Sequence, residues 1–111
     1  MKRHFYKLDE FGHPVPADWF EAGKLLADVH GRCVACHRTE GGVTISTAFL
    51  VFDHDPFGDG PPLLWNTHVY FPAGDYQIAG TYTSLDEALD GHREIVRLFQ
   101  LMSASGGAVG L

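Results

Sequence analysis

The segment from Val43 to Pro72 constrains the fold of this chain most strongly, because it holds two strand-like runs joined by a loop. Both runs are rich in β-branched and aromatic residues, and the loop is dense in Gly, Pro and Asp. This pattern is typical of two strands with a long connection. The end of the first run, Ala48–Phe52, is apolar at every position. A strand with one face in water would alternate apolar and polar residues, so this run predicts a strand covered on both faces.

Two helices and three further strands are predicted around this segment. Asp18 and Glu21 have capping-box spacing at the start of a helix that should end near Gly31. Ser84 and Glu87 form a second capping box, before a C-terminal helix on whose apolar face His92 should be packed and hydrogen-bonded. The first helix is expected to carry one apolar stripe, made of Trp19, Phe20, Ala22, Leu25, Leu26 and Val29. The further strands are expected at residues 4–8, 32–39 and 76–83.

This order of elements predicts an α+β fold in a single domain that spans residues 1–102. Its mostly antiparallel sheet has about four strands and two helices, one helix between the first two strands and one at the C-terminus. Residues 103–111 show no periodicity and are expected to form a flexible C-terminal tail.

The charge of the chain limits its partners. Fourteen acidic residues against eight Lys and Arg give a net charge of -6, which argues against direct binding to a nucleic-acid backbone. A protein partner remains compatible with this charge. The sequence has no apolar segment of bilayer length and no signal-peptide pattern, so we expect no membrane association, a cytoplasmic location and reduced cysteines.

The motif Cys33-Val34-Ala35-Cys36-His37 is the sharpest in the chain. It matches the attachment sequence of c-type haem, but that chemistry needs export, and no export signal precedes it. Zinc is the alternative cofactor, with His30, Cys33, Cys36 and His37 as candidate ligands. If this segment is a strand, alternation would place the two cysteines on opposite faces, and they could not share one ion.

The loop and the second strand hold the candidate residues for binding a ligand or partner. These are Asp53, His54, Asp55, Asp59, Trp65, Asn66, His68 and Tyr70. The acids are expected to be solvated in a turn-forming loop, and Trp65, His68 and Tyr70 could together line a small-ligand pocket. Asp53, His54 and His68 are residue types used in acid–base chemistry, but no catalytic spacing accompanies them, so no catalytic residue is assigned.

Ordered blocks between Asp9 and Val96 resemble a family of small uncharacterised phage and prophage proteins. A strand that ends in Asp53-His54 is followed by a Gly-Pro-Pro-Leu stretch, a second strand and a capped helix that carries Glu87-Ala88 and Gly91-His92. The matching blocks are Asp9, Gly12, Pro14, Arg32–Ala35, Ile45–Leu50, Asp53–His54, Gly58–Trp65, Thr67, Val69, Tyr82–Ser84, Glu87–Leu89 and Gly91–His92. The cysteines are not part of the family pattern, and Asn66 replaces its usual Glu. The resemblance implies the cytoplasm of a phage-infected bacterium and no particular activity.

We therefore expect a small non-enzymatic accessory protein of phage type that binds a host or phage macromolecule, one form being an anti-defence, anti-CRISPR-like inhibitor. Two alternatives stay open: a metal-binding protein or metal-dependent enzyme that uses Cys33, Cys36 and nearby histidines, and a protein that sequesters a small ligand such as a nucleotide. A homodimer is compatible with the sequence if the Leu63–Phe71 strand has an exposed edge.

Overall fold

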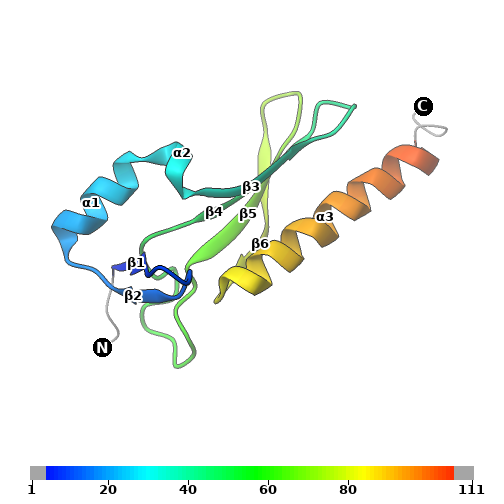
Figure 1. Ribbon diagram of the computed structural model, residues 1–111. Coiled ribbons are helices and arrows are strands. Elements are labelled where there is room, and N and C mark those ends of the chain that lie inside the picture. Colours follow the sequence, from blue (N-terminus) through cyan, green and yellow to red (C-terminus); the bar gives the residue numbers. More distant parts are fainter. Residues whose placement is uncertain (1–4, 107–111) are drawn as a thin grey trace.

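The predicted α+β domain with a four-stranded antiparallel sheet and a C-terminal helix is confirmed by a computed structural model (Figure 1), which describes residues 5–106 and side chains as far as Met102. The elements in chain order are β1 (Tyr6–Leu8), β2 (Pro14–Pro16), α1 (Trp19–Ala27), α2 (Val29–Arg32), β3 (Cys33–Arg38), β4 (Thr44–Phe49), β5 (Trp65–Tyr70), β6 (Tyr76–Tyr82) and α3 (Leu85–Gly106).

The main sheet has the strand order β3-β4-β5-β6, and each strand runs antiparallel to its neighbours. α3 packs along one face of this sheet (Figure 1). Burial along β4 alternates, with Ile45, Thr47 and Phe49 buried and the residues between them only partly so. The predicted run Ala48–Phe52 is a strand only as far as Phe49, so the prediction of one strand over this run is wrong, although Phe49, Leu50 and Val51 are all buried. The strand ends at Phe49, and Val51 then turns the chain with a left-handed φ of 74°, which is unusual for a β-branched residue.

The hydrophobic core lies between the α3-facing side of the sheet, the start of α3 and the N-terminal elements. Its buried members are Ala22, Phe49, Val51, Leu64, Trp65 and Ala88. The Trp65 side chain is fully buried, with its ring centroid 5.3 Å from that of Phe49. Burying such an aromatic pair makes a large contribution to folding, so these two strand ends hold the domain together.

A chain of buried hydroxyls and one imidazole links the sheet to α3. Thr47 Oγ1 lies 2.5 Å from Thr67 Oγ1 and 2.8 Å from His92 Nδ1, and Thr67 Oγ1 lies 3.1 Å from the Tyr82 hydroxyl. His92 is therefore packed and hydrogen-bonded, as the sequence predicted. Desolvation, followed by the charges of His37 and Arg93, lowers the pKa of His92 below its usual value.

The N-terminal region differs from the prediction in three ways, and the first is that the predicted helix is divided at Asp28 into α1 and α2. Residues 14–16 form a strand, β2, that pairs with β1, because Gly12 adopts a φ of 81° in a tight turn that the Asp9 carboxylate closes by accepting from two backbone N–H groups. The capping box of Asp18 and Glu21 is present at the start of α1. The broad apolar stripe predicted for this helix is wrong, however, because Trp19 and Phe20 are 78% and 65% exposed.

The C-terminal helix begins after Ser84, whose hydroxyl accepts from the Glu87 backbone N–H as the predicted capping box requires. The Glu87 carboxylate accepts from the Thr83 backbone N–H. α3 continues to Gly106, four residues beyond the end that the sequence predicted. The rest of the predicted tail, residues 107–111, lies outside the described residues. No helix in residues 5–106 is both long and apolar enough to cross a membrane.

Candidate interaction surface

The face of the sheet opposite α3, here called the open face, carries the most exposed apolar side chains of the strands. Backbone register assigns residues to this face, because cross-strand partners point to the same side. Ser46 pairs with His68, and His68 pairs with Ile78. Thr44 pairs with Tyr70, and Tyr70 pairs with Tyr76. The side chains on the open face come from Cys33, Cys36, Arg38, Thr44, Ser46, Ala48, Asn66, His68, Tyr70, Tyr76, Ile78 and Thr81.

Three rings form a cluster on the open face, at the end of the sheet where β5 turns into β6. The imidazole of His68 stacks on the Tyr70 ring with centroids 5.7 Å apart, and the Tyr76 ring lies 5.4 Å from His68 and 5.8 Å from Tyr70. Tyr70, Tyr76 and Ile78 are 43%, 58% and 57% exposed. Rigid aromatic rings that remain exposed next to an aliphatic side chain are the features of an interface centre.

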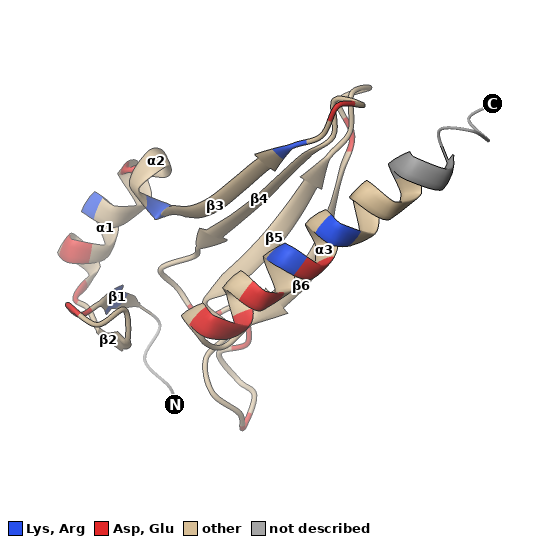
Figure 2. Cartoon of the chain, turned by 45° about the vertical axis from the view of Figure 1, so that its right-hand side comes forward, with Lys and Arg blue, Asp and Glu red and all other residues tan. Residues whose placement is uncertain are grey.

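The open face is almost without charge, although the chain as a whole is acidic. The four strands of the main sheet contain no Asp or Glu and a single Arg, Arg38. In Figure 2 the acidic residues lie mainly on α3, on α1 and in the loops. Desolvation, and then the charge of nearby His54, lower the pKa of His68, so the imidazole stays neutral to a lower pH than a free histidine. The cluster therefore offers a neutral, aromatic surface at neutral pH.

Both cysteines lie on the open face, which corrects the prediction that a strand would separate them. The pairing of β3 with β4 shifts register between Cys33 and Ala35, so one extra residue reverses the alternation. Cys36 pairs with Ser46, and the Cys33 Sγ lies 3.8 Å from the Ser46 Oγ. Both thiols are free and exposed.

The four candidate zinc ligands do not come together. His37 pairs with Ile45 and therefore points to the α3 side of the sheet, away from Cys36, while His30 is exposed in α2. Over residues 5–106 the structure contains no cluster of three or more His, Cys, Asp or Glu side chains that could hold a metal ion. The four-ligand zinc site is therefore not supported by the geometry.

The predicted acids of the loop serve different purposes. Asp53 is buried rather than solvated, and its Oδ1 accepts from the backbone N–H groups of Asp55 and Leu63 at 2.8 and 3.0 Å. This carboxylate closes the base of the long loop. Asp55 and Asp59 are exposed, and the exposed His54 stacks on Phe52 with centroids 4.7 Å apart. Asp53 is therefore buried and hydrogen-bonded within the fold, whereas the other two acids of the loop are exposed.

The remaining predicted site residues fall on opposite sides of β5. Trp65 points into the core, whereas His68 and Tyr70 lie on the open face, so the three cannot line one pocket. Asn66 is on the open face but only 3% exposed. Tyr76 and Ile78 join His68 and Tyr70 on the open face, and the sequence analysis did not name them as site residues. Their spacing of two within a predicted strand indicated that both side chains lie on the same face of the sheet.

The edges of the sheet do not support the predicted route to a dimer. β5 is an inner strand that pairs with β4 on one side and β6 on the other, so the Leu63–Phe71 strand has no free edge over its paired length. The edge strands are β3 and β6, and each carries a register irregularity. Bulges of this kind discourage pairing between edges of two sheets.

Comparison with known proteins identified no relative: neither a protein-family model, nor a curated protein, nor a solved structure matches this chain. The resemblance to phage proteins stays a prediction.

Proposed function

We propose that this protein is a small non-enzymatic binding protein and that its open face docks a protein partner. The observation that carries the proposal is the exposed, uncharged cluster of His68, Tyr70, Tyr76 and Ile78. Tyr is enriched and Lys, Glu and Asp are depleted at the centres of protein interfaces. A phage-infected bacterial cytoplasm is the setting that the sequence resemblance supplies, and inhibition of a host defence complex is the specific form of the proposal.

A protein fits this surface better than a nucleic acid does. Aromatic side chains on a sheet can stack single-stranded bases, but such sites also need cations along the path of the phosphates. Arg38 is the only Lys or Arg in the four strands of the sheet. Because the whole chain also carries a charge of -6, the electrostatic part of nucleic-acid binding would be unfavourable.

The test compares two exposed aromatic residues, one inside the cluster and one outside it. Tyr76→Arg places a charge inside the aromatic cluster of the open face. Phe57→Arg makes the same kind of change at a residue that is 85% exposed in the loop 50–64. Both variants should fold like the wild type, because neither side chain is part of the buried core.

Each tagged protein is used to capture partners from bacterial lysate with and without phage infection, with mass spectrometry as the readout. We expect a partner near one-to-one stoichiometry with wild type and Phe57→Arg, and its loss with Tyr76→Arg. Equal recovery by all three proteins would place the binding site elsewhere. Self-association in light scattering that Tyr76→Arg abolishes, or tight binding of single-stranded DNA or RNA in fluorescence anisotropy, would overturn the proposal of a different protein partner.

A further inference from the structure

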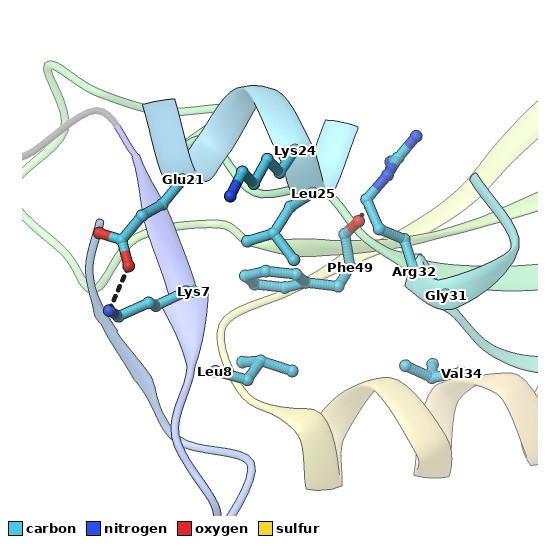
Figure 3. Close-up of a pocket in the computed structure, with 9 residues that line it drawn as sticks. All are labelled: Lys7, Leu8, Glu21, Lys24, Leu25, Gly31, Arg32, Val34 and Phe49. Carbon is cyan, nitrogen blue, oxygen red and sulfur yellow. Dashed lines mark hydrogen bonds and ion pairs between the residues drawn. The ribbon is translucent and has the colours of Figure 1, made fainter. Parts of the chain in front are cut away.

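A pocket of about 550 Å³ lies between the N-terminal elements and the near end of the sheet, away from the aromatic cluster of the open face. Figure 3 shows the Phe49 ring in its middle, with Leu25 and Leu8 on opposite sides of the ring. Its walls come from five elements, β1, α1, α2, β3 and β4, and its lining residues are Lys7, Leu8, Glu21, Lys24, Leu25, Gly31, Arg32, Val34 and Phe49. None of these residues was among the sites predicted from the sequence.

The polar part of the lining is positively charged, although the protein is acidic. Lys7 and Glu21 form an ion pair with Nζ and Oε2 2.5 Å apart (Figure 3). This contact raises the pKa of Lys7 and lowers that of Glu21, as expected for two charged partners. Lys24 and Arg32 form no ion pair with a carboxylate of the described residues, so the lining has a net positive charge. The Lys24 Nζ also lies 4.9 Å from the centroid of the Phe20 ring, outside the lining.

The Arg32 guanidinium is incompletely satisfied. Its two terminal nitrogens donate to the backbone carbonyls of Phe49 and Leu26 at 3.3 and 3.4 Å, which are long distances for such bonds. The Arg32 Nε–H is buried and has no acceptor among the residues that the structure describes. A buried donor left unpaired costs free energy, and the Arg32 guanidinium adds its positive charge to this wall of the pocket.

The rest of the lining is hydrocarbon from Leu8, Leu25, Val34 and Phe49. A volume of about 550 Å³ is within the usual range for sites that bind small molecules. At roughly 30 Å³ for each non-hydrogen atom, it holds an occupant of about 18 such atoms. This combination suits a molecule with an apolar body and one anionic end.

We infer that this pocket binds a small amphipathic oxyanion, a carboxylate or a phosphate monoester. Its apolar part lies against Leu8, Leu25 and Phe49, and its anionic group lies near Lys24, because the Arg32 guanidinium points away from Lys24 (Figure 3). The Lys7–Glu21 pair closes one side of the pocket and offers no net charge. This site uses none of the side chains of the aromatic cluster, so it stands independently of the proposed function.

The experiment is isothermal titration of the full chain with three probes that share one ten-carbon tail and differ in the head group. Decanoate and decyl phosphate are the two anionic probes, and decyltrimethylammonium is the cationic control. The variant is Lys24→Gln, which removes an exposed charge from the pocket. Its matched control is Arg97→Gln, which removes an exposed charge from α3 outside the pocket.

We expect an anionic probe to bind one-to-one, at least about tenfold more tightly than the cation, because one charge-assisted contact is worth about that factor. Lys24→Gln should weaken this binding by about tenfold, and Arg97→Gln should leave it unchanged. The tighter of the two anions identifies the head-group class. Equal binding of the cation, no binding of either anion at millimolar concentration, or equal effects of the two variants would overturn the inference.

Discussion

Substitution of Gly91 by Ala tests how closely α3 approaches the sheet. A methyl group at Gly91 would lie 2.4 Å from both Cε1 and the hydroxyl oxygen of Tyr82, and 2.5 Å from Cζ. The same hydroxyl would meet a methyl group at Gly80 at 2.3 Å, so the Tyr82 ring lies in a slot between two glycines. The new methyl group at Gly91 must therefore displace the Tyr82 ring or the helix.

Two opposing terms set the size of the effect. Replacing Gly by Ala inside a helix gains about 1 kcal/mol of helix propensity. Forcing a methyl group into a packed contact costs about 1–3 kcal/mol, and moving the Tyr82 hydroxyl away from Thr67 costs about 1 kcal/mol more. We therefore expect Gly91→Ala to lower the free energy of unfolding by about 1–3 kcal/mol.

Gly23→Ala in α1 is the matched control, because a methyl group there meets nothing within 4 Å. This variant keeps the propensity gain and should be more stable than wild type by up to about 1 kcal/mol. Urea unfolding followed by circular dichroism measures both changes. In a domain of this size, 1 kcal/mol corresponds to about 4 °C in Tm, so thermal scans should separate the two variants clearly.

The Tyr82→Leu background identifies the source of the cost. Leu lacks the ring atoms that meet the new methyl group, so Gly91→Ala in that background should be neutral or stabilising. If Gly91→Ala proves as stable as Gly23→Ala in the wild-type background, the close contact between α3 and the Tyr82 ring is refuted.

Two further predictions concern buried polar groups. The pKa of His92, like that of His68, is lowered in the folded state, so the unfolded chain binds more protons below pH 6.5. The free energy of unfolding should fall as pH drops from 7.5 to 5.5, by at most about 1.4 kcal/mol per pH unit for each proton. Urea titrations of His92→Gln should show a shallower fall. If the slope with pH is unchanged in this variant, His92 does not contribute to the pH dependence of stability. Asp53→Ala removes the acceptor of two backbone N–H groups and should lower the free energy of unfolding by about 2–3 kcal/mol. Its control, Asp59→Ala, lies at an exposed site and should change the free energy of unfolding by no more than about 0.5 kcal/mol in the same assay. Equal stability of the two Asp variants would contradict the structural role given to Asp53.

The sequence predicted the helix starts and the strands, because these features depend on residues that are close together in the chain. The N-terminal caps of α1 and α3 were readable because a cap acts over three residues, and the strand runs were readable from their β-branched and aromatic content. The packed position of His92 followed from the helical period that places it beside Ala88 and Ile95. The α+β class followed from the order of these elements.

Tertiary structure decided what each strand faces. A single extra residue between Cys33 and Ala35 reversed the alternation and brought both cysteines to the open face, and such a register shift depends on the neighbouring strand. Asp53 is likewise buried in contact with a distant part of the chain, because its carboxylate accepts a hydrogen bond from the backbone N–H of Leu63, ten residues away.

The sequence by itself determined an α+β domain, with its capped helices and the identity of its strands, because those features are encoded within a few residues. The aromatic cluster joins His68 to Tyr76 across two strands, and the cationic pocket joins Lys7 to Phe49 across five elements. Only the tertiary structure decided these surfaces, because they form from side chains that are distant in the chain and meet only after the strands have paired and the helices have packed.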